Sequence, residues 1–157
     1  MLRRFHSEVQ GSIAFGLMDG VASTLGILIG VYAAGGSSVA MVAATLAGGL
    51  AGAFSNAAGV HVSQEVEGGL SEKIVWRSTI GAFISTVLVV IAIAVPLLLL
   101  ALPYNVIASV LVGLAILLSI GVFVIRSWRI GIEYVLMGLI AAVSAYMVGT
   151  AVGLLFV

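Results

Sequence analysis

Five long apolar stretches constrain the fold of this chain more than any other feature of its sequence. Each is long enough to cross the hydrocarbon core of a bilayer as a helix, which takes about 20 apolar residues. They are continuously apolar, whereas the strands of a membrane barrel alternate apolar and polar residues, so we predict helices. The stretches comprise residues 13–34, 39–62, 80–102, 106–125 and 134–157.

The composition agrees with a lipid environment. Apolar residues make up 62% of the chain and charged residues 8%, whereas a typical soluble domain has about 25% charged residues. A soluble domain of this size could not bury so much apolar surface, because most of its area faces water. We therefore expect one all-α domain of five transmembrane helices over residues 1–157. It would be a multi-pass membrane protein, located in the cell membrane if the source is prokaryotic.

The basic residues lie on one side of this five-helix arrangement. The N-terminus, the polar segment 64–77 and the polar hinge 126–133 share that side and carry all six Lys and Arg residues. The turns at 35–38 and 103–105 and the C-terminal end carry none. By the positive-inside rule, the N-terminus is expected in the cytoplasm and the C-terminus outside. With four or six spans, the Lys and Arg residues would be divided between the two sides of the membrane.

Glycine is frequent inside the apolar stretches, and the chain contains 20. Pairs spaced four residues apart place small residues on one helix face, where helices in lipid approach closely. The pairs are Gly16 and Gly20, Gly26 and Gly30, Gly48 and Gly52, and Gly149 and Gly153. Two interpretations are open: ordinary packing within the chain, or a seam between the two copies of a homodimer.

Asp19 is the most informative polar residue. It lies about six residues inside the first stretch, roughly 9 Å below the cytoplasmic edge at 1.5 Å per residue. A carboxylate there costs roughly 2.5–3.5 kcal/mol and usually marks an ion or proton path. Ser23 lies one turn further on the same face, and Asn56 lies at nearly the same depth in the second stretch. We predict a polar patch of these residues; the alternative is a protonated or snorkelling Asp19 with a structural hydrogen bond.

A second group of candidates lies where the second stretch ends. His61 and Glu65 are four residues apart and share a face if the helix continues. Imidazole and carboxylate could bind a divalent cation there, and Glu67 and Glu72 add acidic groups nearby. The alternative is a solvated helix end with a stray histidine.

Several function classes find no support in the sequence. There is no hydrolytic constellation, no GxGxxG after a strand and no phosphate loop, so we expect neither an enzyme nor a bound cofactor. The net charge is zero, which gives no reason to expect nucleic acid as a partner. Cysteine is absent, which excludes disulfides and thiolate metal sites. Trp76 and Trp128 are expected as interfacial anchors, and Arg129 is expected to pair with Glu133.

Two segments of the chain resemble the vacuolar iron transporter family. Residues 18–24, MDGVAST, resemble the NDGLVST motif of that family, and residues 55–63, SNAAGVHVS, resemble its SMAAGEYVS motif. Residues 138–149 are similar to the fifth helix of the family. The resemblance implies a five-helix homodimer that exports Fe²⁺, and often Mn²⁺, from the cytosol in exchange for protons. It also implies that metal passes between the protomers along the first and second helices.

The resemblance places the pathway aspartate of the family on Asp19, its pathway methionine on Asn56 and its motif glutamate on Val60. The family has Asn before its aspartate, where this chain has Met18, so Asn and Met are exchanged between the two helices. We hypothesise that Met18 and Asn56 together rebuild a similar site. Many members carry a long Glu-rich metal-binding domain after the second helix, of which only residues 64–77 remain here.

The predicted function is a divalent metal transporter in which Asp19 binds the cation and exchanges it for a proton. Asn56, with Met18 or Ser23, would complete the coordination. The residues expected to gather metal at the cytoplasmic mouth are His61, Glu65, Glu67 and Glu72. Two alternatives stay open: a non-transporting dimeric scaffold or regulatory module, and a transporter or channel for another solute. The expected partners are the cation, the lipid bilayer and a second copy of the chain.

Overall fold

The computed structural model describes residues 2–156, with side chains from Ser7 onward, and it confirms the five predicted helices. They are α1 (Leu2–Ala33), α2 (Ser38–Glu67), α3 (Glu72–Leu99), α4 (Tyr104–Ser119) and α5 (Trp128–Phe156). α4 continues into a π-helical turn, η1, at Ile120–Val124. Five helices are long and apolar enough to cross a bilayer, as expected of a multi-pass membrane protein.

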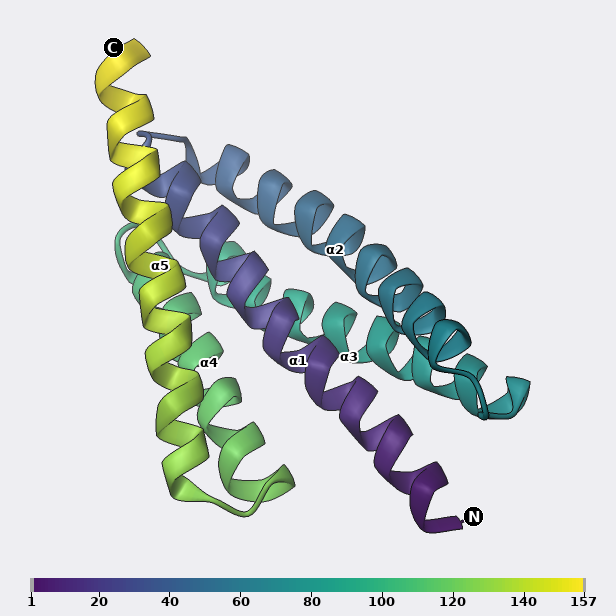
Figure 1. Ribbon diagram of the computed structural model, residues 1–157. Helices are drawn as coiled ribbons and strands as arrows, with labels where there is room; N and C mark the ends of the chain where they lie inside the picture. Colours follow the sequence, from purple (N-terminus) through teal and green to yellow (C-terminus); the bar gives the residue numbers. More distant parts are fainter. Residues whose placement is uncertain (1, 157) are drawn as a thin grey trace.

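α1 lies at the centre of the bundle, with α2 on one side and α5 on the other (Figure 1). It also packs along α3, where the two helices contribute to one buried apolar cluster that includes Leu25, Leu28 and Ile93. Large apolar side chains on the outer faces of the helices are exposed, for example Leu88 and Leu111. Exposed apolar surface of this extent requires an apolar surrounding, which a bilayer supplies.

The helices extend further than the apolar stretches predicted, above all at the polar segment 64–77. α2 continues to Glu67 and α3 begins at Glu72, so only residues 68–71 interrupt the helices. Gly68 and Gly69 both have positive φ angles, 70° and 76°, a conformation that only glycine adopts without strain. The predicted hinge 126–133 is also shorter, because α5 begins at Trp128. Hydropathy identifies the part of a helix that faces lipid. Backbone hydrogen bonds continue the helix beyond that part, so the helices are longer than the apolar stretches.

Three of the four glycine pairs pack within the chain. Gly16 and Gly20 face α3, where a Cβ at Gly20 would lie 3.3 Å from the Cα of Thr86. The pair on α2 and the pair on α5 both face α1: Gly48 meets Ile27, Gly52 meets Ser23, Gly149 meets Gly30 and Gly153 meets Ala34. In the fourth pair, Gly26 has open space where its Cβ would be. Close approach inside one chain therefore explains most of this spacing.

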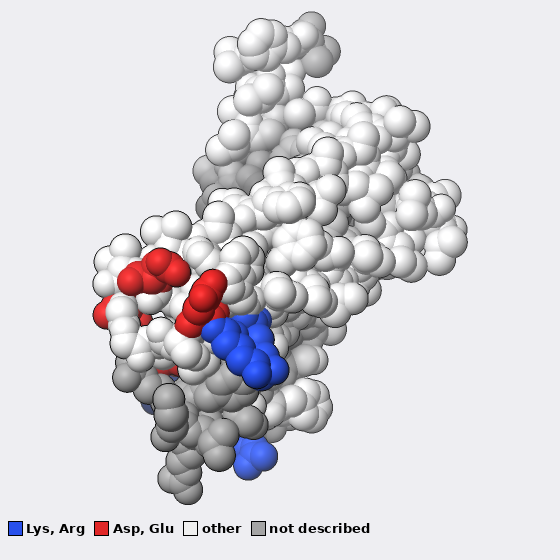
Figure 2. Space-filling view, turned by 90° about the vertical axis from the view of Figure 1, so that its right-hand side faces the viewer, with Lys and Arg blue, Asp and Glu red and all other residues white. Residues whose placement is uncertain are grey.

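On the face seen in Figure 2, the charged side chains gather at one end, and the remainder of that face shows none. This is the end where α2 meets α3 and where α5 begins (Figure 1), and we call it the charged end. The predicted pair of Arg129 and Glu133 is confirmed there, with 3.2 Å between Nε and Oε1. Asp19 lies apart from this end, near the middle of the span Ser7–Ala33. Arg3, Arg4 and His6 have side chains outside the described residues.

Candidate functional site

α1 and α2 run antiparallel, and their contacts establish which residues lie at the same level. Ser12 bonds to Gln64 near the charged end, and Ser23 faces Gly52 further along the two helices. Between these contacts, the same register places Asp19 at the level of Asn56. The common depth predicted for these two residues agrees with this register.

Asn56 turns its amide toward α3. Its Nδ2 donates to Thr86 Oγ1 at 3.1 Å, and the residue is only 7% exposed. Thr86 Oγ1 in turn lies 3.0 Å from the carbonyl oxygen of Gly16 on α1 and 2.9 Å from that of Ala82 on its own helix, and these two oxygens share its single proton. One hydroxyl therefore contacts α1, α2 and α3. With Nδ2 engaged in this way, Oδ1 is the only atom of Asn56 that can coordinate a cation.

Asp19 is half-buried near the middle of the 27-residue span Ser7–Ala33. It lies further from the start of its helix than the sequence predicted, because α1 begins well before the apolar stretch. Its carboxylate makes no hydrogen bond or ion pair with any other residue that the structure describes. Ser23 donates its hydroxyl to the backbone oxygen of Asp19 at 2.7 Å, and Met18 packs against the apolar core. An unpaired carboxylate at this depth is available to a cation or a proton.

His61 and Glu65 share a face, as predicted, with 3.8 Å between Nε2 and Oε1. The other ring nitrogen, Nδ1, lies 3.1 Å from Thr79 Oγ1. Thr79 Oγ1 also lies 2.9 Å from the backbone oxygen of Val75, so the tautomer of the ring decides which group donates in the contact between His61 and Thr79. The ring of His61 is thus held between the Thr79 hydroxyl and the Glu65 carboxylate. A second group that orients the ring in this way is typical of metal-ligating histidines.

The acidic residues predicted to act together at the mouth lie on two sides of α2. Glu67 lines a cavity of about 280 Å³ between α1 and α2. Glu65 and Glu72 line a separate cavity of about 300 Å³ beneath the turn that joins α2 to α3. Residues 65 and 67 are 200° apart around a helix at 100° per residue, so the continuation of α2 through Glu67 separates them. Gln64 borders both cavities.

Among the residues that the structure describes, no three His, Cys, Asp or Glu side chains lie close enough together to hold a metal ion. Asp19, Met18 and Asn56 thus lie at one level of the α1–α2 pair and Ser23 lies one turn further along α1, while the mouth residues form two further groups at the charged end. No single chain brings them into one site.

No protein-family model, curated protein or solved structure matches this chain.

Sequence reasoning missed the polar residues that link the helices: Ser12, Gln64, Thr79 and Thr86. Each lies in or beside an apolar run, where a single Ser, Thr or Gln most often bonds its own helix. Their partners come from other helices, so their roles depend on helix rotation. Glu8 was missed as well, and it lines the cavity that Glu67 also lines.

The link between Asn56 and Thr86 is expected to stabilise the packing of α2 on α3. Thr86→Val keeps the side-chain shape but leaves the amide of Asn56 without its acceptor, which costs about 1–3 kcal/mol. In a double-mutant cycle with Asn56→Leu, measured by thermal unfolding in detergent, we expect a coupling energy of about 1 kcal/mol. Ser119→Ala removes an exposed hydroxyl that bonds its own helix and should change stability by less than about 0.5 kcal/mol. Additive effects of the two substitutions would contradict the link.

Proposed function

We propose that this protein transports divalent metal, Fe²⁺ or Mn²⁺, out of the cytosol in exchange for protons. The observation that carries the proposal is the carboxylate of Asp19, which is half-buried and unpaired among the described residues, near the middle of a membrane-spanning helix. A charged carboxylate in that position costs roughly 2.5–3.5 kcal/mol. A bound cation or a proton removes this cost, and alternation between the two is the chemistry of antiport.

The surroundings of Asp19 support an ion path that leads from the charged end to its carboxylate, rather than an isolated charge. The cavity between α1 and α2 runs from Glu8 and Glu67 at the charged end to Phe15 and Gly59. Phe15 precedes Asp19 by four residues, about 6 Å along the helix axis. A cation entering at the charged end would therefore need to advance about one helical turn beyond the cavity to reach Asp19. The basic residues at this end favour a cytoplasmic location for it.

The resemblance of residues 18–24 and 55–63 to the vacuolar iron transporter family supports the same assignment. It adds a homodimer, in which the Asp19 residues of two protomers would supply ligands that one chain lacks. Asn56 Oδ1 would be an additional donor at this level of the bundle, and the thioether of Met18, which packs against the apolar core, would have to turn toward Asp19 to join it. His61 and Glu65 would gather metal at the mouth.

The direct test is cation transport by the purified protein in proteoliposomes. We expect Mn²⁺ and Fe²⁺ to enter faster than into protein-free vesicles, with protons moving in the opposite direction. Vesicles that pass neither cation would contradict the proposal. Competition by other cations or by unrelated solutes would instead identify a transporter of a different substrate.

The homodimer is expected to form along the outer face of α2, where small residues are exposed: Ala43, Ala47, Ala51, Ala58 and Gly59. Because the chain has no cysteine, a single introduced thiol reports on its own position. Ala51→Cys should form a disulfide-linked dimer in native membranes, since a disulfide requires Cα atoms about 4.4–6.8 Å apart. Leu88→Cys, on the exposed side of α3, should form no disulfide-linked dimer. Equal yields from the two variants would contradict a dimer along α2.

A non-transporting scaffold or regulatory module is the second candidate. The observation in its favour is the hydrogen bond from Asn56 to Thr86, which gives a residue of the second motif a structural role. Calorimetry separates the candidates, because a scaffold would bind neither Fe²⁺ nor Mn²⁺.

A further inference from the structure

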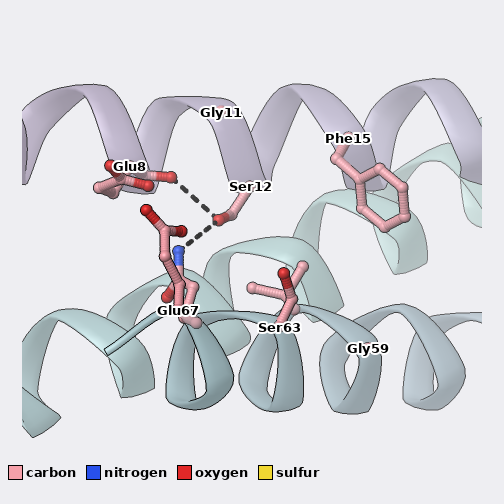
Figure 3. Close-up of a pocket in the computed structure, with 9 residues that line it drawn as sticks. Glu8, Gly11, Ser12, Phe15, Gly59, Ser63 and Glu67 are labelled. Carbon is pink, nitrogen blue, oxygen red and sulfur yellow. Dashed lines mark hydrogen bonds between the residues drawn. The ribbon is translucent and has the colours of Figure 1, made fainter. Parts of the chain in front are cut away.

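Five of the nine residues that line the cavity between α1 and α2 at the charged end have oxygen-bearing side chains. Glu8 and Ser12 come from α1, and Ser63, Gln64 and Glu67 come from α2. Figure 3 shows Glu67 beside Glu8 and Ser12, at the end of the cavity opposite Phe15. The volume of about 280 Å³ has room for a cation with several of its waters, since a water molecule occupies about 30 Å³ in the liquid.

Gln64 has a buried oxygen that lacks a partner among the described residues. The residue is 7% exposed, and its Oε1 accepts no hydrogen bond from them. Ser12 donates its proton to the backbone oxygen of Glu8 at 2.9 Å, so it can only accept from the amide nitrogen of Gln64, which lies 3.5 Å away. This arrangement leaves Oε1 as the free end of the amide. A buried acceptor without a donor costs about 1–3 kcal/mol, unless a ligand satisfies it.

The position of Glu67 on its helix adds to the negative potential. Glu65 and Glu67 both lie in the last turn of α2, which has no basic residue. A helix C-terminus carries partial negative charge, so a carboxylate there is unfavourable by about 0.3–1 kcal/mol. Two carboxylates from different helices, a helix C-terminus and an unsatisfied amide oxygen all favour the same ligand, a cation.

We infer that this cavity binds a hydrated divalent cation of the hard class, through the carboxylates of Glu8 and Glu67 and the amide oxygen of Gln64. Its polar lining offers oxygen donors and no imidazole or sulfur, which suits Mn²⁺, Fe²⁺ or Mg²⁺. Glu8 precedes Asp19 by eleven residues on α1, about three helical turns, and the assignment of the cavity as a loading site rests on the proposed transport function. Binding itself does not depend on transport.

The test uses Mn²⁺ as the probe and the full-length protein in detergent. Free hexahydrated Mn²⁺ gives a six-line paramagnetic resonance signal that disappears on binding, so a titration yields the dissociation constant. We expect Glu8→Gln and Glu67→Gln each to weaken binding at least about tenfold, a loss of 1.4 kcal/mol. Gln64→Leu should weaken it as well, and Gln64→Glu should strengthen it by adding a third carboxylate.

Glu133→Gln is the matched control, because it removes the same charge from the same end of the molecule but belongs to the exposed pair with Arg129. It should change the dissociation constant by less than about twofold, as expected for a screened surface charge. Size-exclusion profiles and thermal unfolding establish that each variant is folded. The inference is overturned if the parent binds no Mn²⁺ at millimolar concentration, or if Glu133→Gln weakens binding as much as Glu67→Gln does.

The outcome separates this site from the proposed function. If Glu8→Gln and Glu67→Gln lower Mn²⁺ affinity while Asp19→Asn transports like the parent, the cation site stands and the transport mechanism fails. If transport requires Asp19 while Glu8→Gln and Glu67→Gln bind Mn²⁺ like the parent, the mechanism stands and the site fails.

Discussion

Replacing Asp19 with Asn is expected to reduce the initial rate of Mn²⁺ uptake into proteoliposomes at least about tenfold, equivalent to 1.4 kcal/mol in the transport barrier. Asparagine keeps the size of the side chain but can neither carry a negative charge nor release a proton at neutral pH. It therefore removes both halves of the proposed exchange. Proton counterflow, followed by a pH-sensitive dye inside the vesicles, should fall in parallel.

Misfolding would not explain such a loss, because Asp19→Asn removes a charge that is costly within the membrane. The variant should unfold at a temperature no lower than the parent. The matched control is Glu133→Gln, which makes the same chemical change at an exposed pair with Arg129. Since exposed pairs are worth about 0–1 kcal/mol, its transport and stability should stay close to those of the parent. Uptake by Asp19→Asn at the parental rate would refute the mechanism.

Adding one methyl group at Gly16 is expected to destabilise the bundle by about 1–3 kcal/mol. In Gly16→Ala, the new Cβ would lie 2.5 Å from the backbone oxygen of Ala82 and 3.1 Å from its Cα. Both are backbone atoms of α3, so α1 and α3 must move apart, and the hydrogen bond from Thr86 to Gly16 would lengthen with them. The unfolding temperature in detergent should fall by several degrees.

Gly26→Ala is the matched control on the same helix. Gly26 belongs to a glycine pair of identical spacing, but its Cβ would meet nothing within 4 Å. Alanine is a better helix former than glycine by about 0.5–1 kcal/mol, so this variant should be as stable as the parent or slightly more stable. An equal loss at both positions would show that spacing, rather than the contact with α3, determines the effect.

The sequence alone was sufficient to predict the number of helices and which part of the chain each one occupies. The free energy of transferring apolar surface out of water is proportional to the area and does not depend on direction. Continuous apolar runs therefore indicate membrane-spanning helices without any knowledge of their neighbours. Local rules were equally reliable. The spacing of four residues correctly paired Arg129 with Glu133 and placed His61 beside Glu65.

The tertiary structure determined how each helix is rotated about its own axis, and therefore which side chains face which neighbours. The sequence placed Asn56 at the level of Asp19, but rotation of α2 directs its amide nitrogen to Thr86. The same rotation assigns Glu67 to the cavity with Glu8 and Glu65 to the side of His61, although the sequence showed one acidic cluster. In a helix that is apolar on all sides, hydropathy carries little information about rotation. Close packing at glycines and hydrogen bonds between helices set the rotation instead, and both require residues that are far apart in the chain.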